Sequence, residues 1–211
     1  MSRITDDTIT TARLTSFSDG VFAIAVTLLV FNLKVPHIPA DKVHEQLCDA
    51  ILGMLPNFTT YVITFLLVAL YWTFHHRMLN LVTHIDTPFL WMNIGYLLSI
   101  SFIPFPAMLF GTYPKETVSF VFYIGSMIVI AALSMLMLAY ASYNSRLTAK
   151  ELPVAVVKYL FFRQFTSVIV FMLSIPIAFY QLRWALDSLF ILFPIHWFTR
   201  KYFRKYAGKN G

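Results

Sequence analysis

Long apolar runs separated by short polar connections dominate the chain. A helix needs about 20 predominantly apolar residues to cross a hydrocarbon core of roughly 30 Å. Each run therefore predicts a transmembrane helix, and together they form a single domain over residues 1–211. The six expected spans lie near 17–34, 57–76, 88–111, 117–141, 154–181 and 184–199. The pattern predicts an all-α membrane protein.

One segment follows a different pattern. Residues 41–55 carry charged side chains beside Val43, Leu47, Ile51 and Leu55, which recur every four residues. This spacing places the apolar side chains on one face of a helix. We expect an amphipathic helix that lies at the membrane surface.

The composition supports a membrane protein and argues against other classes. Hydrophobic residues make up 58% of the chain and charged residues only 12%, whereas a soluble domain averages about 25% charged residues. The net charge of +6 comes from basic residues at span ends and near the C-terminus. That distribution favours anionic lipid headgroups over nucleic acid as a partner. We expect a multi-pass protein of the cell membrane.

The basic residues also predict the orientation, because Lys and Arg favour cytoplasmic loops. With six spans, one side of the membrane holds both termini and carries Arg3, Arg13, Arg77, Arg146, Lys150, Arg200, Lys201, Arg204, Lys205 and Lys209. The other side carries Lys34, Lys42, Lys115 and Arg183. We therefore expect both termini in the cytoplasm. Lys158 and Arg163 fall inside the fifth span, and their long stems are expected to snorkel to the interface.

The start of the first span holds the most informative polar residues. A carboxylate within a membrane helix is costly unless it is paired or hydrated, so Asp19 is expected to face protein or water. Arg13 lies six residues earlier, on a different side of the helix, so each needs a partner from another span. Trp72 and His76 are spaced i, i+4 and share one face of the second span. They are candidate partners, as is Asn93.

Further along the first span, Ile24, Leu28 and Phe31 form one stripe, with Thr27 beside it. Periodicity alone leaves two interpretations open, because a helix–helix contact and a lumen both require such a stripe.

Enzymatic and metal-binding motifs are absent from the sequence. No HExxH, GxSxG, Walker or CxxC pattern occurs, and each of these would be needed for its own chemistry. The adjacent His75 and His76 diverge by about 100° on a helix and are not expected to share a metal ion. We expect no enzyme activity, no metal and no cofactor.

The string Arg13-x-x-x-Phe17-Ser18-Asp19 resembles the signature of the transmembrane protein 175 family. The resemblance extends to Tyr71-Trp72-x-x-His75-His76 at the end of the second span, and to Asn93 and Ile103-Pro104-Phe105-Pro106 in the third. These are potassium-permeable channels, and the chain is similar to a prokaryotic member of the family.

The resemblance implies a homotetramer whose pore is lined by the first helix of each chain and which conducts potassium ions passively. It implies a hydrophobic constriction at Ile24, with further rings at Leu28 and Phe31, and a selectivity layer at Thr27. It also implies that the pore helix is held by a support network, formed by Arg13, Phe17, Ser18, Asp19, Trp72 and His76.

The residues allow an alternative function of a different class. Asp19 and His76 are both able to carry a proton, which is typical of a proton- or ion-coupled membrane transporter. Such transporters often contain inverted repeats, and no clear repeat is visible in the sequence.

Overall fold

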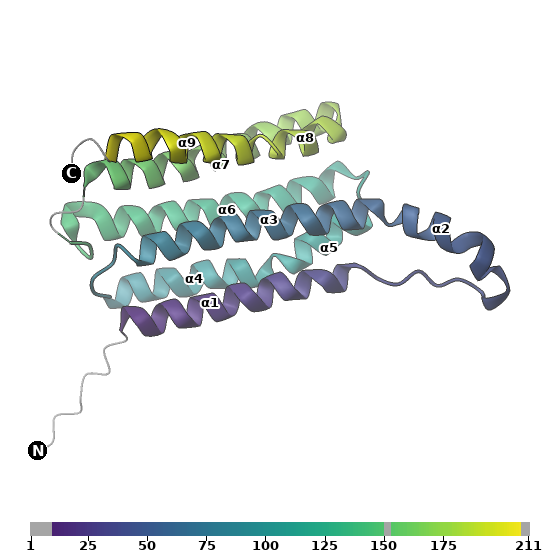
Figure 1. Ribbon diagram of the computed structural model, residues 1–211, viewed down its shortest axis with the longest axis horizontal. Helices are drawn as coiled ribbons and strands as arrows, with labels where there is room; N and C mark the ends of the chain where they lie inside the picture. Colours follow the sequence, from purple (N-terminus) through teal and green to yellow (C-terminus); the bar gives the residue numbers. More distant parts are fainter. Residues whose placement is uncertain (1–9, 150–152, 208–211) are drawn as a thin grey trace, which may run out of the picture.

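The computed structural model describes residues 10–149 and 153–207, and the side chains of Arg200 and of residues 202–207 are not described. Arg3, Lys150 and Lys209, which contributed to the expected orientation, lie outside the described residues. Within these ranges the chain is helical, and the long helices run side by side (Figure 1). The helices are α1 (Thr11–Leu28), α2 (Val43–Gly53), α3 (Leu55–Leu79), α4 (Thr87–Phe102), α5 (Pro104–Thr112), α6 (Thr117–Ser142), α7 (Val154–Tyr180), α8 (Leu182–Leu189) and α9 (Leu192–Ala207).

Five stretches of the described chain are long and apolar enough to cross a membrane. They are Thr11–Asn32, Leu55–Leu79, Thr87–Thr112, Thr117–Ser145 and Val154–Tyr180. The first of these ends in a short 3₁₀ helix, η1 (Leu29–Asn32), which continues α1. The third contains a break, because Pro104 has no N–H and its ring clashes with the preceding turn. The chain therefore passes from α4 to α5 at Ile103.

The expected single helix over 184–199 is two helices. α8 ends at Leu189 and α9 starts at Leu192. Pro194 cannot donate to the carbonyl of Phe190, so the backbone hydrogen bond that would continue the helix is lost. The amides of Phe190 and Ile191 instead donate to the carbonyls three residues earlier, those of Asp187 and Ser188, at 3.2 Å each. Together, α8 and α9 run back along α7, and α9 ends at the end of the bundle where α1 begins (Figure 1).

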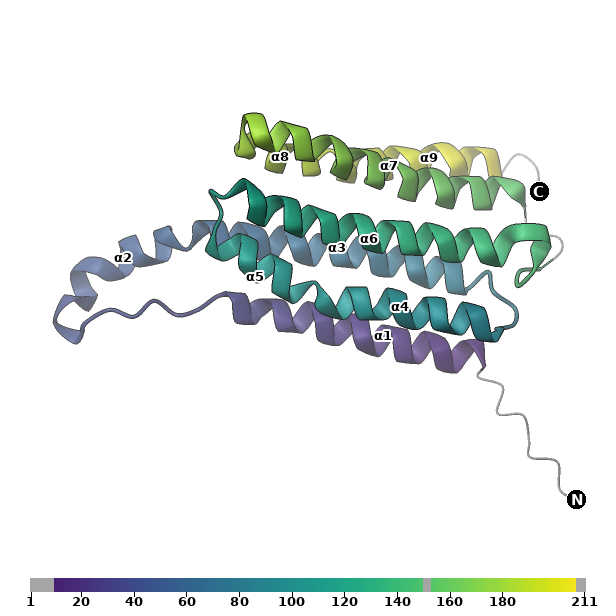
Figure 2. The same cartoon turned by 180° about the vertical axis from the view of Figure 1, so that it is seen from behind.

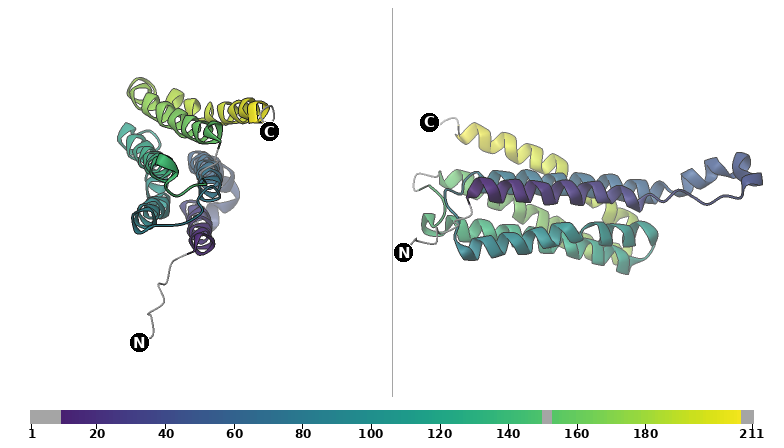
Figure 3. Two further views of the ribbon diagram at one scale, coloured as in Figure 1. Left: turned by 90° about the vertical axis from the view of Figure 1, so that its left-hand side faces the viewer. Right: turned by 90° about the horizontal axis from the view of Figure 1, so that it is seen from below.

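The helices form two groups when the bundle is viewed end-on (Figure 3). α1 packs against α3 and α4, and α6 packs against α4 and α7. The hairpin of α7 with α8 and α9 makes the layer farthest from α1. The core consists of apolar side chains from every long helix, including Phe74, Phe89, Tyr96, Phe120 and Ile130.

α2 stands apart from this bundle. It projects beyond the end at which α1 finishes (Figure 2), and among its residues none is buried. Val43, Leu47 and Ile51 form an exposed apolar row, being 38%, 43% and 48% exposed. The structure therefore has a helix where the amphipathic segment 41–55 is expected.

A polar cluster fixes the start of α4 against the end of α6. Asp86 accepts hydrogen bonds from the Phe89 amide (3.0 Å), the Tyr140 hydroxyl (2.6 Å) and Arg146 Nε (3.2 Å). Burial raises the pKa of the Asp86 carboxyl, but these hydrogen bonds outweigh it and hold the pKa below its ordinary value of 3.8. Asp86 therefore remains ionised as the N-cap of α4.

Candidate functional site

One face of α1 makes little contact with the rest of the chain. Ile24 is 61% exposed, Leu28 40% and Phe31 70%, although all three are large and apolar. Exposed Thr27 lies on the same face. We call Ile24, Thr27 and Leu28 of α1, together with Phe31 of the continuing η1, the free face of α1. A free face this apolar indicates a surface that meets something other than bulk water.

The Thr27 hydroxyl is already bonded within its own helix. Its Oγ1 lies 3.0 Å from the Ala23 carbonyl and 2.9 Å from the Ile24 carbonyl, so the hydroxyl proton points back along the backbone. The oxygen keeps its lone pairs available as acceptors. Thr27 therefore offers a weak oxygen ligand on an otherwise apolar face.

The opposite face of α1 is packed into the bundle. The buried residues are Leu14, Ser18, Phe22 and Ala25 of α1 and Leu29 of η1, where this stretch meets α3 and α4. The centroid of the Phe22 ring lies 5.7 Å from that of His75 on α3 and 6.1 Å from that of Tyr96 on α4. One aromatic side chain thus joins three helices.

A buried hydrogen-bond chain continues this contact. His75 Nε2 lies 2.7 Å from Asn93 Oδ1, so the imidazole donates to the amide oxygen in the tautomer protonated at Nε2. Asn93 Nδ2 donates to Ser18 Oγ at 3.3 Å, and Ser18 Oγ donates to the Leu14 carbonyl at 2.8 Å. The His75 and Tyr96 rings stack 4.9 Å apart and 1° from parallel. These three hydrogen bonds link side chains of α1, α3 and α4 and hold the three helices in one register.

A second, partly exposed contact lies one residue further along α1. Trp72 Nε1 donates to Asp19 Oδ1 at 2.8 Å, and the Trp72 ring stacks on His76 with centroids 5.6 Å apart. Asp19 and Trp72 also line a groove of about 370 Å³ between α1 and α3. His76 Nδ1 is buried and has no hydrogen-bond partner in the described part of the chain.

The expected support network is thus divided into three parts. Asp19, Trp72 and His76 lie together, whereas Ser18 belongs to the buried chain with Asn93 and His75. Arg13 and Phe17 are exposed. Neither side chain makes a hydrogen bond or ring contact with the described residues, although the Arg13 amide donates to the N-cap Thr10 Oγ1 at 3.4 Å.

From the sequence, Asn93 was a candidate partner for Arg13 or Asp19, and His75 was left out of the support network. In the structure, Asn93 bonds to His75 and Ser18 instead. A signal for His75 was present in the sequence. Tyr71, His75 and Met78 follow helical spacing, and the two apolar members of this row point to a buried face.

A separate polar cluster joins α7 to α3, α6 and α9. Arg163 is only 4% exposed, and its Nη2 donates to the Leu70 carbonyl at 3.0 Å. The expectation that Arg163 snorkels to the interface is therefore wrong, because α3 and α9 cover that side of α7. Next to it, Gln164 Nε2 donates to Ser134 Oγ, and His196 Nε2 lies 3.2 Å from Ser167 Oγ. Lys158, one turn before this cluster, is exposed.

No group of three or more His, Cys, Asp or Glu side chains is placed to hold a metal ion in the described ranges.

Comparisons with known proteins match the part of the chain that carries both α1 contacts. The model of the family described as endosomal/lysosomal potassium channel TMEM175 matches residues 13–104. A potassium channel of Chamaesiphon minutus is 34% identical over 146 residues, which cover 67% of this chain and 70% of that protein. The chain belongs to the TMEM175 family.

A second relative and a solved structure show how much of the chain is similar to known channels. A potassium channel of Streptomyces collinus is 33% identical over 104 residues, 49% of either chain. The crystal structure of a lysosomal potassium-selective channel TMEM175 homolog from Chamaesiphon minutus has a TM-score of 0.76 at 25% identity. It covers 92% of this chain and 97% of that one.

The structural match extends the TMEM175 fold beyond the segment that the family model matches. Residues 13–104 include Ser18, Asp19, Trp72, His75 and Asn93, but not the cluster around Arg163. The structural similarity covers nearly the whole chain, so α6 to α9 belong to the same fold. Since five stretches of the described residues are long and apolar enough to cross a membrane, this TMEM175 member is a multi-pass membrane protein.

Proposed function

We propose that this chain is one subunit of a potassium-preferring cation channel of the plasma membrane. Four copies surround a central pore, and the free face of α1 from each copy lines it. The observation that supports this assignment is the exposure of Ile24, Leu28 and Phe31, in a relative of proteins named potassium channels. Ion conduction here is passive, and no covalent bond is made or broken.

The mechanism follows from the side chains of the free face. Four Ile24 side chains form an apolar constriction, which stops conduction by dewetting when it narrows. Leu28 and Phe31 form further apolar rings. Thr27 oxygens supply weak ligands beside the constriction and ease partial dehydration of the ion. Potassium is less tightly hydrated than sodium, so the apolar ring favours potassium, with modest discrimination.

The contacts behind the free face form the support for the pore helix. The chain from His75 through Asn93 to Ser18 and the contact from Asp19 to Trp72 hold α1 against α3 and α4. A displacement of α1 by a fraction of an ångström would alter the width of an Ile24 ring. The exposed Arg13 and Phe17 are available for contacts with neighbouring subunits.

The remaining architecture is proposed on the same basis. The single domain over 1–211 crosses the membrane six times, with α8 and α9 together forming the sixth crossing. Both termini lie in the cytoplasm, which is consistent with the shared end of the bundle at which α1 begins and α9 ends (Figure 1). The permeant potassium ions need no cofactor, and membrane lipids surround the tetramer.

The experiment that tests this function is a reversal-potential measurement in planar bilayers, with potassium on one side and sodium on the other. Wild-type protein is expected to give a current that reverses toward the potassium equilibrium potential. Ile24→Ala is expected to give a larger current, because a smaller ring wets more readily. A complete lack of current from folded protein would contradict the proposal.

One observation favours a second candidate, a proton- or ion-coupled transporter. Asp19 and His76 both contact the Trp72 ring system, so two groups able to carry a proton meet at one side chain. Coupled uptake into liposomes that is abolished by Asp19→Asn, without bilayer current, would favour this candidate. A channel whose conductance persists in Asp19→Asn would exclude it.

A further inference from the structure

A small groove lined by apolar side chains and one lysine lies between α6 and α7. It has a volume of about 330 Å³ and is lined by Met135, Val157, Lys158, Phe161, Phe162 and Phe165. α6 and α7 pack along each other over much of their length (Figures 1 and 2). The groove is therefore a feature of two membrane-spanning helices and opens at their shared surface.

The charge in this groove lies at one end of it. Lys158 is one turn into α7, while Phe165 lies seven residues further along, about 10 Å deeper at 1.5 Å per residue. Lys158 is exposed and makes no ion pair or hydrogen bond with any residue that the structure describes. Phe162 and Phe165 are 49% and 51% exposed. An unpaired ammonium group at one end of an open apolar groove is complementary to an amphiphile with an anionic headgroup.

The position of the groove indicates which amphiphile is available. Viewed end-on, α7 belongs to the layer farthest from α1 (Figure 3). If the free face of α1 lines the pore, as proposed above, the α6–α7 groove lies toward the outside of the assembly. Bilayer lipid, rather than another subunit, then surrounds it.

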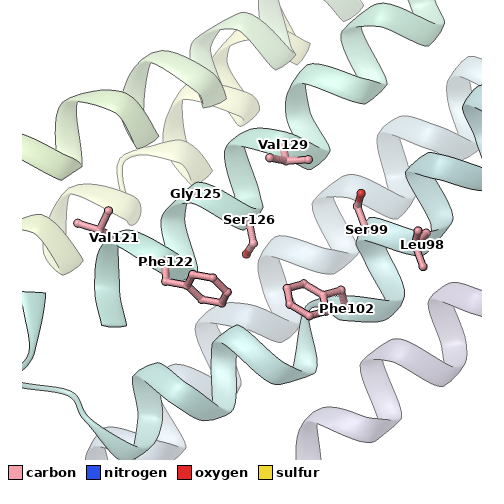
Figure 4. Close-up of a pocket in the computed structure, with 8 residues that line it drawn as sticks. All are labelled: Leu98, Ser99, Phe102, Val121, Phe122, Gly125, Ser126 and Val129. Carbon is pink, nitrogen blue, oxygen red and sulfur yellow. The ribbon is translucent and has the colours of Figure 1, made fainter. Parts of the chain in front are cut away.

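A larger groove on the same protein lacks the charged residue that distinguishes the α6–α7 groove. The space between α4 and α6 has a volume of about 750 Å³, and no charged residue lines it (Figure 4). Its two hydroxyls are bonded within their own helices, Ser99 to the Gly95 carbonyl at 3.1 Å and Ser126 to the Tyr123 carbonyl at 2.7 Å. That groove has nothing with which to distinguish one lipid headgroup from another.

We propose that the α6–α7 groove is a binding site for an anionic phospholipid. One acyl chain lies along Phe161, Phe162 and Phe165, and the Lys158 ammonium group binds the phosphate of the headgroup. A lysine stem that reaches toward the interface while its methylenes cover apolar surface is suited to this arrangement.

Lipid titration followed by native mass spectrometry tests the proposal on the purified, full-length protein. Phosphatidylglycerol and phosphatidylcholine with identical acyl chains are compared. We expect Lys158→Gln to weaken phosphatidylglycerol binding about fivefold, as one lysine near an anionic surface provides, and to leave phosphatidylcholine binding unchanged. Lys158→Arg should retain the preference. The matched control is Lys115→Gln, an exposed lysine at the opposite end of the bundle, which should have no effect.

Two further variants test the apolar part of the site. Val157→Trp fills the groove and should reduce binding of both lipids there, whereas Val129→Trp in the uncharged groove should leave the phosphatidylglycerol preference intact. Inorganic phosphate alone should not stabilise the protein against heat.

The following results would overturn the proposal. These are an unchanged preference in Lys158→Gln, an equal loss in Lys115→Gln, and protection by free phosphate equal to that by phosphatidylglycerol. A change of oligomeric state in Val157→Trp would also overturn it, because the groove would then be a subunit contact.

Discussion

The two faces of α1 are both apolar, yet they are used in opposite ways. Phe22 on the inner face is 3% exposed and touches rings on α3 and α4, whereas Ile24, two residues later, is 61% exposed. On the inner face, Ser18 donates to the Leu14 carbonyl and accepts from Asn93, so its hydrogen bonds are made inside the protomer. The free face contains one hydroxyl whose acceptor capacity is left open. Burial and hydrogen bonding therefore separate a face that holds the fold from a face that the protomer leaves open.

The largest expected effect comes from removing the aromatic contact of the inner face. Phe22→Ala leaves a cavity beside His75 and Tyr96 and should lower the free energy of unfolding by about 3–5 kcal/mol. Denaturant unfolding in detergent micelles measures it. The matched control is Phe17→Ala, because Phe17 is 59% exposed and its loss should cost less than about 1 kcal/mol. Equal costs for the two variants would remove the distinction between the faces.

A smaller loss is expected from breaking the buried hydrogen-bond chain. Asn93→Ala leaves His75 Nε2 and Ser18 Oγ without the amide and should cost about 1–3 kcal/mol. Asn80→Ala provides the comparison, because Asn80 is exposed at the end of α3 and should cost less than about 0.5 kcal/mol. An Asn93→Ala protein as stable as wild type would show that the chain contributes nothing to holding α1.

Loss of the hydrogen bond between Trp72 and Asp19, at the border of the two faces, should lower the free energy of unfolding by a still smaller amount. Trp72→Phe keeps an aromatic ring but removes the indole N–H that Asp19 accepts, at an expected cost of about 1 kcal/mol. The same change at Trp91, which is 66% exposed and donates no hydrogen bond to the described residues, should be neutral. Thermal unfolding in the same detergent compares the two. If Trp91→Phe proves as costly as Trp72→Phe, the hydrogen bond to Asp19 is not the cause.

The free face should show the smallest effect on stability. Ile24→Ala removes a side chain with few contacts in the protomer and should change the free energy of unfolding by less than about 0.5 kcal/mol. The same variant should increase the current, which separates function from folding at one position. A destabilisation comparable to that of Phe22→Ala would mean that Ile24 is a packing residue.

The contrast between the faces explains what the sequence could predict. The apolar runs were sufficient to predict an all-α membrane fold, and the i, i+4 spacing of Trp72 and His76 predicted their shared face. Periodicity could not decide which side of α1 is inside, because Phe22 and Leu29 are as apolar as Ile24 and Leu28. That choice depends on where α3 and α4 lie, which is a tertiary property.

The errors have the same physical origin. Arg163 was expected to reach the interface, but α3 and α9 cover its side of α7 and the Leu70 carbonyl accepts its hydrogen bond. The span over 184–199 was expected to be continuous, although Pro194 could have indicated the break between α8 and α9. Local rules predicted helices and their faces, while neighbours from distant parts of the chain decided the partners of Asn93 and Arg163.

The most direct test of the central claim, that the free face of α1 lines the pore, is thiol modification during bilayer recording. Cys48 is the only cysteine and is replaced by Ser in all variants. Thr27→Cys is compared with Val129→Cys, because both positions are exposed in the protomer but only Thr27 belongs to the free face. A charged, water-soluble thiol reagent should irreversibly reduce the current of Thr27→Cys and leave that of Val129→Cys unchanged. An unaffected Thr27→Cys current, or an equal loss in both variants, would contradict the account.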